Sequence, residues 1–428
     1  MFVKSSYECR QDIGGMVLVS RDLGVSYPKH TWWYRFFMYS ARGVLMPFAR
    51  WKLRLKTRPD RRKMDRPSIL LYNHVSNDDF YCSLDLYRPY TRYILSDAML
   101  RNKLNAIIYP LCTDFIYRRK GDKGDDTVKS VKVTIEKGIS VGLSAEGGVS
   151  TNGTTEEIRP RTGVMVKECG CGMVTMISYG GYFIHPTWSH YKAKGPMFGK
   201  VVGIYTKEQV QAMTSDEINE VIARDLYFNH YDWNRKERIP YIRQNRAEWM
   251  ERVAGICPKC KSEGTMHSCV DDLYCEKCGY KVTVDDYGFF NGDDVIFDNL
   301  YDWDMWQRGY LESKRQEWLD SPDEIITSDE HLSISVLRNN MPEILDEDVR
   351  LEMNAKEIRI IGEKCNMVMP LDEIGGIIRA IPDGFGIVYH DEYYQLKAPY
   401  PLWNAKHRYI RKIIRGESIR VTRTCDTV

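Results

Sequence analysis

Short apolar runs alternate with amphipathic stretches between residues 68 and 235. The apolar runs include SILLY at 68–72, SVGLS at 140–144 and MVTMIS at 173–178, and TVKSVKVTIEKG at 127–138 has the spacing of a helix with one buried face. Short strands separated by helical patterns indicate helices packed on a sheet. We therefore predict an α/β domain over residues 67–235, with a mixed sheet flanked by helices.

The end of this domain has a helical pattern with a start signal inside it. The segment TKEQVQAMTSDEINEVIARDLY at 206–227 reads as helical, and Thr214 in TSDE fits the first residue of a capping box. The charged stretch that follows predicts a helical linker over residues 236–255.

The last hundred residues change from helical to strand-like patterns. Seven short apolar runs with turn residues between them begin at SISVLR and end at EYYQLK, and the helix-like WNAKHRYIRKIIRG follows at 403–416. We predict a connector over 291–330 and a mostly-β C-terminal domain over 331–428. The order of seven strands and one helix resembles that of a pleckstrin-homology-like barrel. Such a domain either docks on a membrane or partner, or only stabilises the rest of the chain.

The first 66 residues combine aromatic and basic side chains. Between residues 30 and 56 no acidic residue occurs, while Trp and Phe alternate with Arg and Lys. Aromatic rings at the apolar boundary and cations on the wet side are typical of a helix lying in a membrane interface. The alternative is a helix packed on its own domain with a solvated basic face, since Pro47 interrupts the pattern.

Length and charge narrow the possible classes. A chain of 428 residues is expected to form two or three domains. A formal net charge of only +2 argues against a protein built to wrap nucleic acid. No basic segment followed by an apolar one opens the chain, and no apolar run approaches the roughly 20 residues that span a bilayer. We therefore expect a cytoplasmic protein bound peripherally to the cytoplasmic face of a membrane.

Four of the twelve cysteines have metal-ligand spacing. They form two C-x2-C pairs, Cys257 with Cys260 and Cys275 with Cys278. Two such knuckles supply four thiolates for a closed tetrahedral site, so we predict a structural zinc ribbon over residues 256–290. Zinc ribbons also bind nucleic acid, but the acidic residues in this segment balance its lysines, which argues against nucleic acid as a partner.

One histidine stands close to two carboxylates. His74 is followed by Asp78 and Asp79 in NHVSNDD. A histidine is the usual general base for a hydroxyl attacking a thioester, and a carboxylate on its other ring nitrogen would fix the tautomer and stabilise the imidazolium. The spacing alone leaves both aspartates open as partners.

The order of several blocks resembles the glycerolipid acyltransferase family, which includes lysophosphatidic acid (PlsC-like) acyltransferases. N-H-x4-D corresponds to Asn73, His74 and Asp79, an apolar stretch ending in Arg corresponds to DFIYR at 114–118, and the family's FPEGTRS corresponds to SAEGGVS at 144–150. Arg161-Thr162-Gly163 resembles the later basic-Thr-Gly block. The resemblance covers about residues 30–235.

The resemblance implies roles for particular residues. His74 would be the general base, Asp79 its partner, and Arg118 a ligand of the acceptor's phosphate, because a planar guanidinium binds two oxygens at once. Asn73, Glu146 and Gly147 would shape the substrate site, with Glu146 bonding to the acceptor. Acyl-CoA or acyl carrier protein would donate the acyl group to a lysolipid hydroxyl.

One departure from the family pattern concerns the acceptor. Val149 stands where the family has an arginine, so one phosphate-binding charge is missing. Either Arg159 or Arg161 replaces it, or the acceptor lacks a phosphomonoester, as a lyso-aminolipid does. Three hypotheses follow: a membrane-lipid acyltransferase, a non-catalytic lipid- or partner-binding scaffold with a structural zinc ribbon, and a nucleic-acid-binding ribbon protein. Retention of the base and its carboxylate favours the first.

Overall fold

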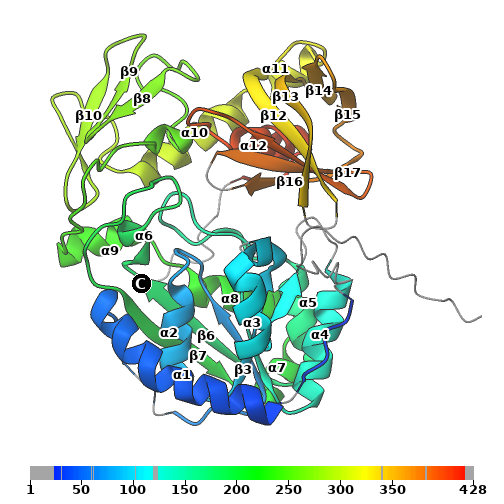
Figure 1. Ribbon diagram of the computed structural model, residues 1–428. Helices are drawn as coiled ribbons and strands as arrows, with labels where there is room; N and C mark the ends of the chain where they lie inside the picture. Colours follow the sequence, from blue (N-terminus) through cyan, green and yellow to red (C-terminus); the bar gives the residue numbers. More distant parts are fainter. Residues whose placement is uncertain are drawn as a thin grey trace, which may run out of the picture.

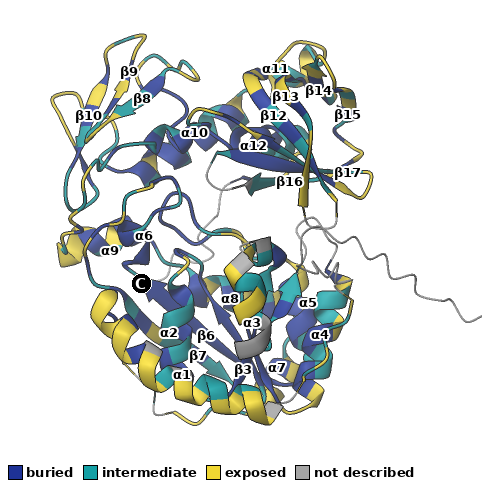
Figure 2. Cartoon of the chain, in the orientation of Figure 1, coloured by how far each residue is buried: buried dark blue, intermediate teal, exposed yellow. Residues whose placement is uncertain are grey.

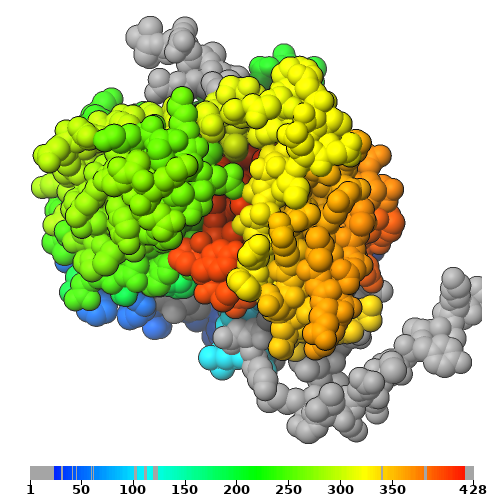
Figure 3. All heavy atoms as spheres, turned by 90° about the horizontal axis from the view of Figure 1, so that it is seen from above, coloured from blue at the N-terminus to red at the C-terminus, as the bar shows by residue number. Residues whose placement is uncertain are grey.

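The computed structural model describes residues 24–29, 31–58, 60, 62–101, 103–118, 124–338, 341–380 and 383–419. An α/β body carries two further parts, a small cysteine-containing sheet and a separate β domain, which lie side by side above it (Figures 1 and 3).

The α/β body is built on a seven-stranded sheet with the order β1-β7-β6-β2-β5-β3-β4. Neighbouring strands are parallel except β6 and β7, which are antiparallel, so the predicted mixed sheet is confirmed. The strands are β1 (Lys56–Thr57), β2 (Ser68–Tyr72), β3 (Thr91–Ser96), β4 (Ile116–Arg118), β5 (Ser140–Ser144), β6 (Gly172–Tyr179) and β7 (Phe198–Tyr205).

Helices cover both faces of this sheet, as the side-chain alternation of β2 requires. Ile69 and Leu71 pack with apolar residues of α4 (Asp125–Glu136), α5 (Arg161–Cys169) and α8 (Ser215–Leu226). Leu70 and Tyr72 face the opposite side, toward α2 (Asp79–Leu86). All five residues of β2 are buried, which fixes the position of the loop that follows.

The predicted helix over 206–227 is two helices. The first is α7 (Lys207–Ala212) and the second α8, and each begins with a complete capping box, at Thr206 and Thr214. Thr214 lies in the extended region in order to accept the bond from Glu217 N, and this conformation ends the first helix. The capping signal was correct and the continuity was wrong.

The helix predicted near the N-terminus is α1 (Thr31–Lys52), and Pro47 lies inside it. Met46 and Ala49 pack into the core, whereas Trp32, Phe36 and Trp51 are exposed (Figure 2). The helix α3 (Lys103–Cys112), preceded by a 3-10 turn (Asp97–Arg101), packs beside α1. Among the described helices, none combines the length and hydropathy needed to cross a bilayer.

The helical linker predicted over 236–255 is wrong. After α6 (Gly181–Ile184) and α9 (His230–Glu237), the segment has only a 3-10 turn at Met250–Arg252. Arg238 and Asn245 have positive φ, which ends helical structure. The backbone instead bonds to the cysteine-containing part, with Tyr241 N donating to Asp286 O and Ala247 N to Val270 O.

The cysteine module, residues 256–291, contains an antiparallel sheet with the order β11-β10-β9-β8. Its strands are β8 (Met266–Cys269), β9 (Asp272–Cys275), β10 (Lys281–Val284) and β11 (Phe290–Asn291), and the predicted connector forms α10 (Leu300–Ser313) and α11 (Arg315–Asp320).

The C-terminal domain is one antiparallel sheet with a helix, so the prediction of a separate β-rich domain is confirmed. Its order is β15-β14-β13-β12-β18-β17-β16. The elements are β12 (Thr327–Arg338), β13 (Met341–Met353), β14 (Glu357–Gly362), β15 (Asn366–Pro370), β16 (Ile374–Ala380), β17 (Gly384–Tyr389), β18 (Glu392–Lys397) and α12 (Lys406–Ile414). Ile410 of α12 is buried in the core of this sheet.

Candidate active site

The loop after β2 is anchored by Asn73. The Asn73 side chain is fully buried, its Nδ2 donates to Ser178 O at 2.9 Å, and its Oδ1 accepts from Ser178 N at 2.8 Å. These bonds join the ends of the parallel strands β2 and β6. Asn73, predicted to bind substrate, therefore holds the loop in place and offers no exposed polar atom to a ligand.

His74 and Asp79 are brought together by this loop. His74 Nδ1 lies 3.0 Å from Asp79 Oδ2, and the same oxygen accepts from the backbone N–H groups of Val75 and Ser76 at 2.7 and 2.9 Å. The other oxygen, Oδ1, accepts from Ser178 Oγ at 2.6 Å. Asp79 is buried at the first turn of α2, so its carboxylate is held in one orientation by four donors.

This arrangement selects the tautomer of His74. Asp79 accepts only, so Nδ1 of the neutral ring carries the proton and Nε2 keeps its lone pair. Among the described residues, the structure records no partner for Nε2, and the His74 side chain is 27% exposed. A neutral imidazole with a free, accessible Nε2 can accept a proton.

Glu146 supports the same loop from the other side. Its Oε1 accepts from His74 N at 2.7 Å and its Oε2 from Glu156 N at 2.7 Å. Burial raises the pKa of this carboxyl well above its usual range, although the two backbone bonds oppose that shift. The sequence predicted a bond from Glu146 to the acceptor, but in the structure both oxygens bind the chain's own backbone.

Two arginines lie near the turn at Gly147. Gly147 has a φ of +69° and Arg159 lies so close above it that a side chain at position 147 would clash with the guanidinium. Arg118, the predicted phosphate ligand, ends β4 and is half-buried, with its guanidinium against Gly124. The predicted alternative Arg161 instead pairs with Asp125 at 2.6 Å.

Several residues at this site could not be found from the sequence motifs. Ser178 completes the shell of Asp79 from β6, 99 residues further along the chain. Arg379 of β16 donates from Nη2 to the backbone oxygen of Val149. The sequence carries no local signal for either contact, because each depends on how distant strands and domains pack.

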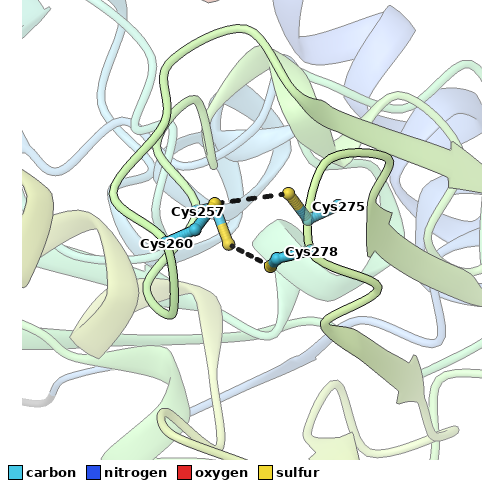
Figure 4. A group of neighbouring side chains, drawn as sticks. All are labelled: Cys257, Cys260, Cys275 and Cys278. Carbon is cyan, nitrogen blue, oxygen red and sulfur yellow. Dashed lines mark hydrogen bonds between the residues drawn. The ribbon is translucent and has the colours of Figure 1, made fainter.

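The four cysteines meet as predicted, each from one of the two knuckles (Figure 4). All four Sγ atoms lie within 4.8 Å of one another, with Cys257 to Cys278 at 3.6 Å and Cys260 to Cys275 at 3.7 Å. Four sulfurs that each lie about 2.3 Å from one tetrahedral zinc would be roughly 3.8 Å apart. The donor set therefore fits a metal such as zinc, and four protein ligands leave no open position for catalysis.

No protein-family model matches the chain, and no curated protein matches it. Among solved structures, the 1-acyl-sn-glycerophosphate acyltransferase PlsC from Thermotoga maritima aligns at 14% identity and a TM-score of 0.33, covering 44% of this chain and 90% of that one. The C-terminal domain of an unknown protein from Leishmania infantum aligns at 10% identity and a TM-score of 0.14, covering 21% and 83%. TM-scores this low do not establish a common fold.

Proposed function

We propose that this protein is an acyltransferase that moves a fatty acyl group from acyl-CoA or acyl carrier protein to the hydroxyl of a lysolipid, with His74 as general base. The observation that carries the proposal is the His74–Asp79 pair, in which a fully bonded carboxylate orients a histidine with a free Nε2. The block resemblance to glycerolipid acyltransferases supplies the reaction class.

The proposed reaction uses these atoms. Nε2 of His74 takes the proton of the acceptor hydroxyl while the hydroxyl oxygen attacks the thioester carbonyl. The carbon–sulfur bond then breaks as the tetrahedral species collapses. The imidazolium returns the proton to the leaving thiolate, so the base is regenerated. Asp79 stabilises the imidazolium. General-base assistance of this kind increases the reaction rate roughly a hundred- to ten-thousand-fold.

The proposal includes a membrane surface as the place where the lysolipid is met. It is supported by exposed apolar side chains on two neighbouring helices, Trp32, Phe36, Phe48 and Trp51 on α1 and Leu104, Ile107 and Ile108 on α3. Large apolar side chains exposed together on adjacent helices mark an interaction surface. Sedimentation with anionic vesicles tests this part, and equal binding by wild type and a Trp51→Glu, Ile107→Glu double variant would contradict it.

The proposed zinc ion has a structural role. Cys257, Cys260, Cys275 and Cys278 would hold it, and it would fix the two knuckles of the module relative to each other. Elemental analysis of the purified protein is expected to give one zinc per chain, and less than half an equivalent would contradict the assignment.

The central experiment measures acyl transfer with acyl-CoA or acyl carrier protein and a panel of lysolipids. Wild type is expected to turn over at least one acceptor, and His74→Ala to lose about a hundredfold or more. His331→Ala is the matched control, because that histidine lies on the C-terminal domain and is 71% exposed. Equal turnover by wild type and His74→Ala would remove His74 from the mechanism. No turnover of any acceptor, with vesicle binding intact, would favour the lipid-binding scaffold.

A further inference from the structure

A small cavity lies where three parts of the chain meet. Its lining comes from the α/β body, from the segment after α9 and from the C-terminal domain: Thr151, Thr187 and Trp188, then Arg252 and Val253, then Arg379 and Asn404. The cavity measures about 10 Å³, which is room for one group of about the size of a water molecule. Two arginines from different parts of the chain therefore border one small space.

Both arginines have buried N–H groups that lack an acceptor. Among the described residues, none accepts from Nε or Nη1 of Arg379 or from Nε of Arg252. Arg252 is only 5% exposed, and its two other nitrogens donate to Trp188 O and Asp383 Oδ1. Arg379 donates from Nη2 to Val149 O. Buried donors without a partner are rare in native proteins and indicate that a water molecule or an ion completes the site.

Charge distinguishes an ion from a water molecule here. Arg252 pairs with Asp383, and Arg408 Nη2 of α12 lies 3.8 Å from Glu156 Oε2. No carboxylate in the described part of the chain lies within ion-pair distance of Arg379. Burial lowers the pKa of Arg379 to about 10, although Glu156 opposes that shift, so the guanidinium stays charged at neutral pH. A buried charge without a counter-ion is costly, and an anion offsets that cost where a water molecule does not.

We propose that this cavity binds one small monovalent anion of the size of chloride, held by Arg379 and Arg252. Guanidinium nitrogens only donate, so the bound group must accept several hydrogen bonds at once. Sulfate and phosphate, with four oxygens each, are too large for the space. The ion joins the α/β body to the C-terminal domain, because its two arginines come from different parts of the chain.

The anion site is connected to the loop that carries His74. Ser150 N donates to His74 O at 2.8 Å. On one side of Ser150, Val149 O accepts from Arg379, and on the other side Thr151 lines the cavity. An ion that fixes Arg379 therefore also fixes the short segment that holds the backbone of His74.

A chloride titration of the full-length protein tests the site. The protein is exchanged into sodium gluconate, whose anion is too large for the cavity, and chloride then replaces gluconate at constant ionic strength. The melting temperature is expected to rise by a few degrees and to level off once the site is filled, because an ion that binds only the folded state stabilises it. Sulfate is expected to give no saturable rise. Equal melting temperatures in gluconate and chloride would overturn the site.

Arg379→Gln removes the unbalanced charge and the buried donors, so the rise with chloride is expected to disappear. Arg359→Gln is the matched control, since Arg359 is an exposed arginine of the same domain that pairs with Glu357, and it is expected to keep the rise. Arg379→Lys keeps the charge with a different donor geometry and is expected to need about tenfold more chloride, which covers the case that Arg379→Gln does not fold. A rise of the same size and midpoint in either Arg379 variant as in wild type would overturn the assignment.

Hydrogen exchange tests the connection to His74. Protection of the Ser150 amide is expected to be greater in chloride than in gluconate, and protection of the Val210 amide, which bonds to Thr206 O in α7, is expected to stay the same. Equal protection of Ser150 in the two salts would overturn the connection. These measurements do not depend on acyl transfer, so the anion site and the proposed function can fail separately.

Discussion

The loop that carries His74 and the cysteine cluster are held in opposite ways. The loop is fixed by hydrogen bonds between residues far apart in sequence, with Asn73 bonded to Ser178 across 105 residues and His74 to Glu146 across 72. The cysteines lie within 21 residues of one another and converge on a point that suits a metal ion. A site held by many protein bonds weakens step by step, whereas a site held by one ion fails at once.

Removing the metal should have the largest effect, and it should affect the two sites differently. Structural zinc contributes of order 10 kcal/mol to folds of this kind, so chelation is expected to unfold the cysteine module while the His74 loop stays ordered. Hydrogen exchange would show this as lost protection at Cys275 N and Gly279 N, which bond within the second knuckle, and retained protection at Val75 N and Ser76 N. Lost protection at all four amides would show that the two sites do not fold independently.

Asp79→Asn should have the next largest effect. The asparagine side chain has one acceptor oxygen where the carboxylate has two, and its NH2 group donates. It therefore favours the tautomer of His74 that carries the proton on Nε2. We expect kcat to fall by about a thousand- to ten-thousand-fold, on the scale known for catalytic triads.

Asp78→Asn is the matched control, because Asp78 is the neighbouring acid that the sequence left open as a partner. Its kcat is expected to stay within about twofold of wild type. A larger loss in Asp78→Asn than in Asp79→Asn would reverse the assignment.

Acid should destabilise the protein through His230. This side chain is fully buried, and burial lowers its pKa to about 4, below the ordinary value of 6.5. The unfolded chain therefore binds the proton more readily than the folded one. As the pH falls from about 6.5 to about 4, this residue is expected to lower the free energy of unfolding by up to about 3 kcal/mol.

His230→Asn isolates that effect. The asparagine amide can replace the Nδ1 bond to Gly153 O but does not titrate. Denaturant midpoints measured at several pH values are expected to change less between pH 7 and 4 in this variant than in wild type. If the denaturant midpoint changed equally with pH in the variant and in wild type, the acid sensitivity would belong to other groups.

Ser178→Ala should have the smallest effect. It removes one of four hydrogen bonds to Asp79 and leaves the other three in place. A loss of about 1 kcal/mol in the free energy of unfolding and a fall in kcat of about tenfold are expected. Ser333→Ala, on β12, is the control. A fall in kcat as large as that expected for Asp79→Asn would show that the three remaining hydrogen bonds do not hold the carboxylate in place.

Local chemistry made parts of this structure predictable from the sequence. The C-x2-C spacing brings cysteines together whatever surrounds them, and the apolar alternation of the C-terminal strands indicated the sheet that is found. The spacing of His74 left two aspartates open, because only the start of α2 decides which carboxylate turns back toward the ring. The contacts of Arg379 with Val149 and of Arg408 with Glu156 could not be predicted from the sequence, because they depend on how two domains pack together.

The helix α12 contacts both the cysteine module and the loop that follows Val149. Lys406, in its first turn, bonds to Glu263 of the cysteine module and to Asp329, at 2.9 and 2.8 Å, while Arg408 and Lys412 pair with Glu156 and Glu157. Figure 3 shows this part of the chain, in orange-red, seated in the seam between the cysteine module and the β domain. Unfolding of the cysteine module would take away one of the two carboxylates that hold Lys406, so the placement of α12 depends on a part of the chain more than a hundred residues before it.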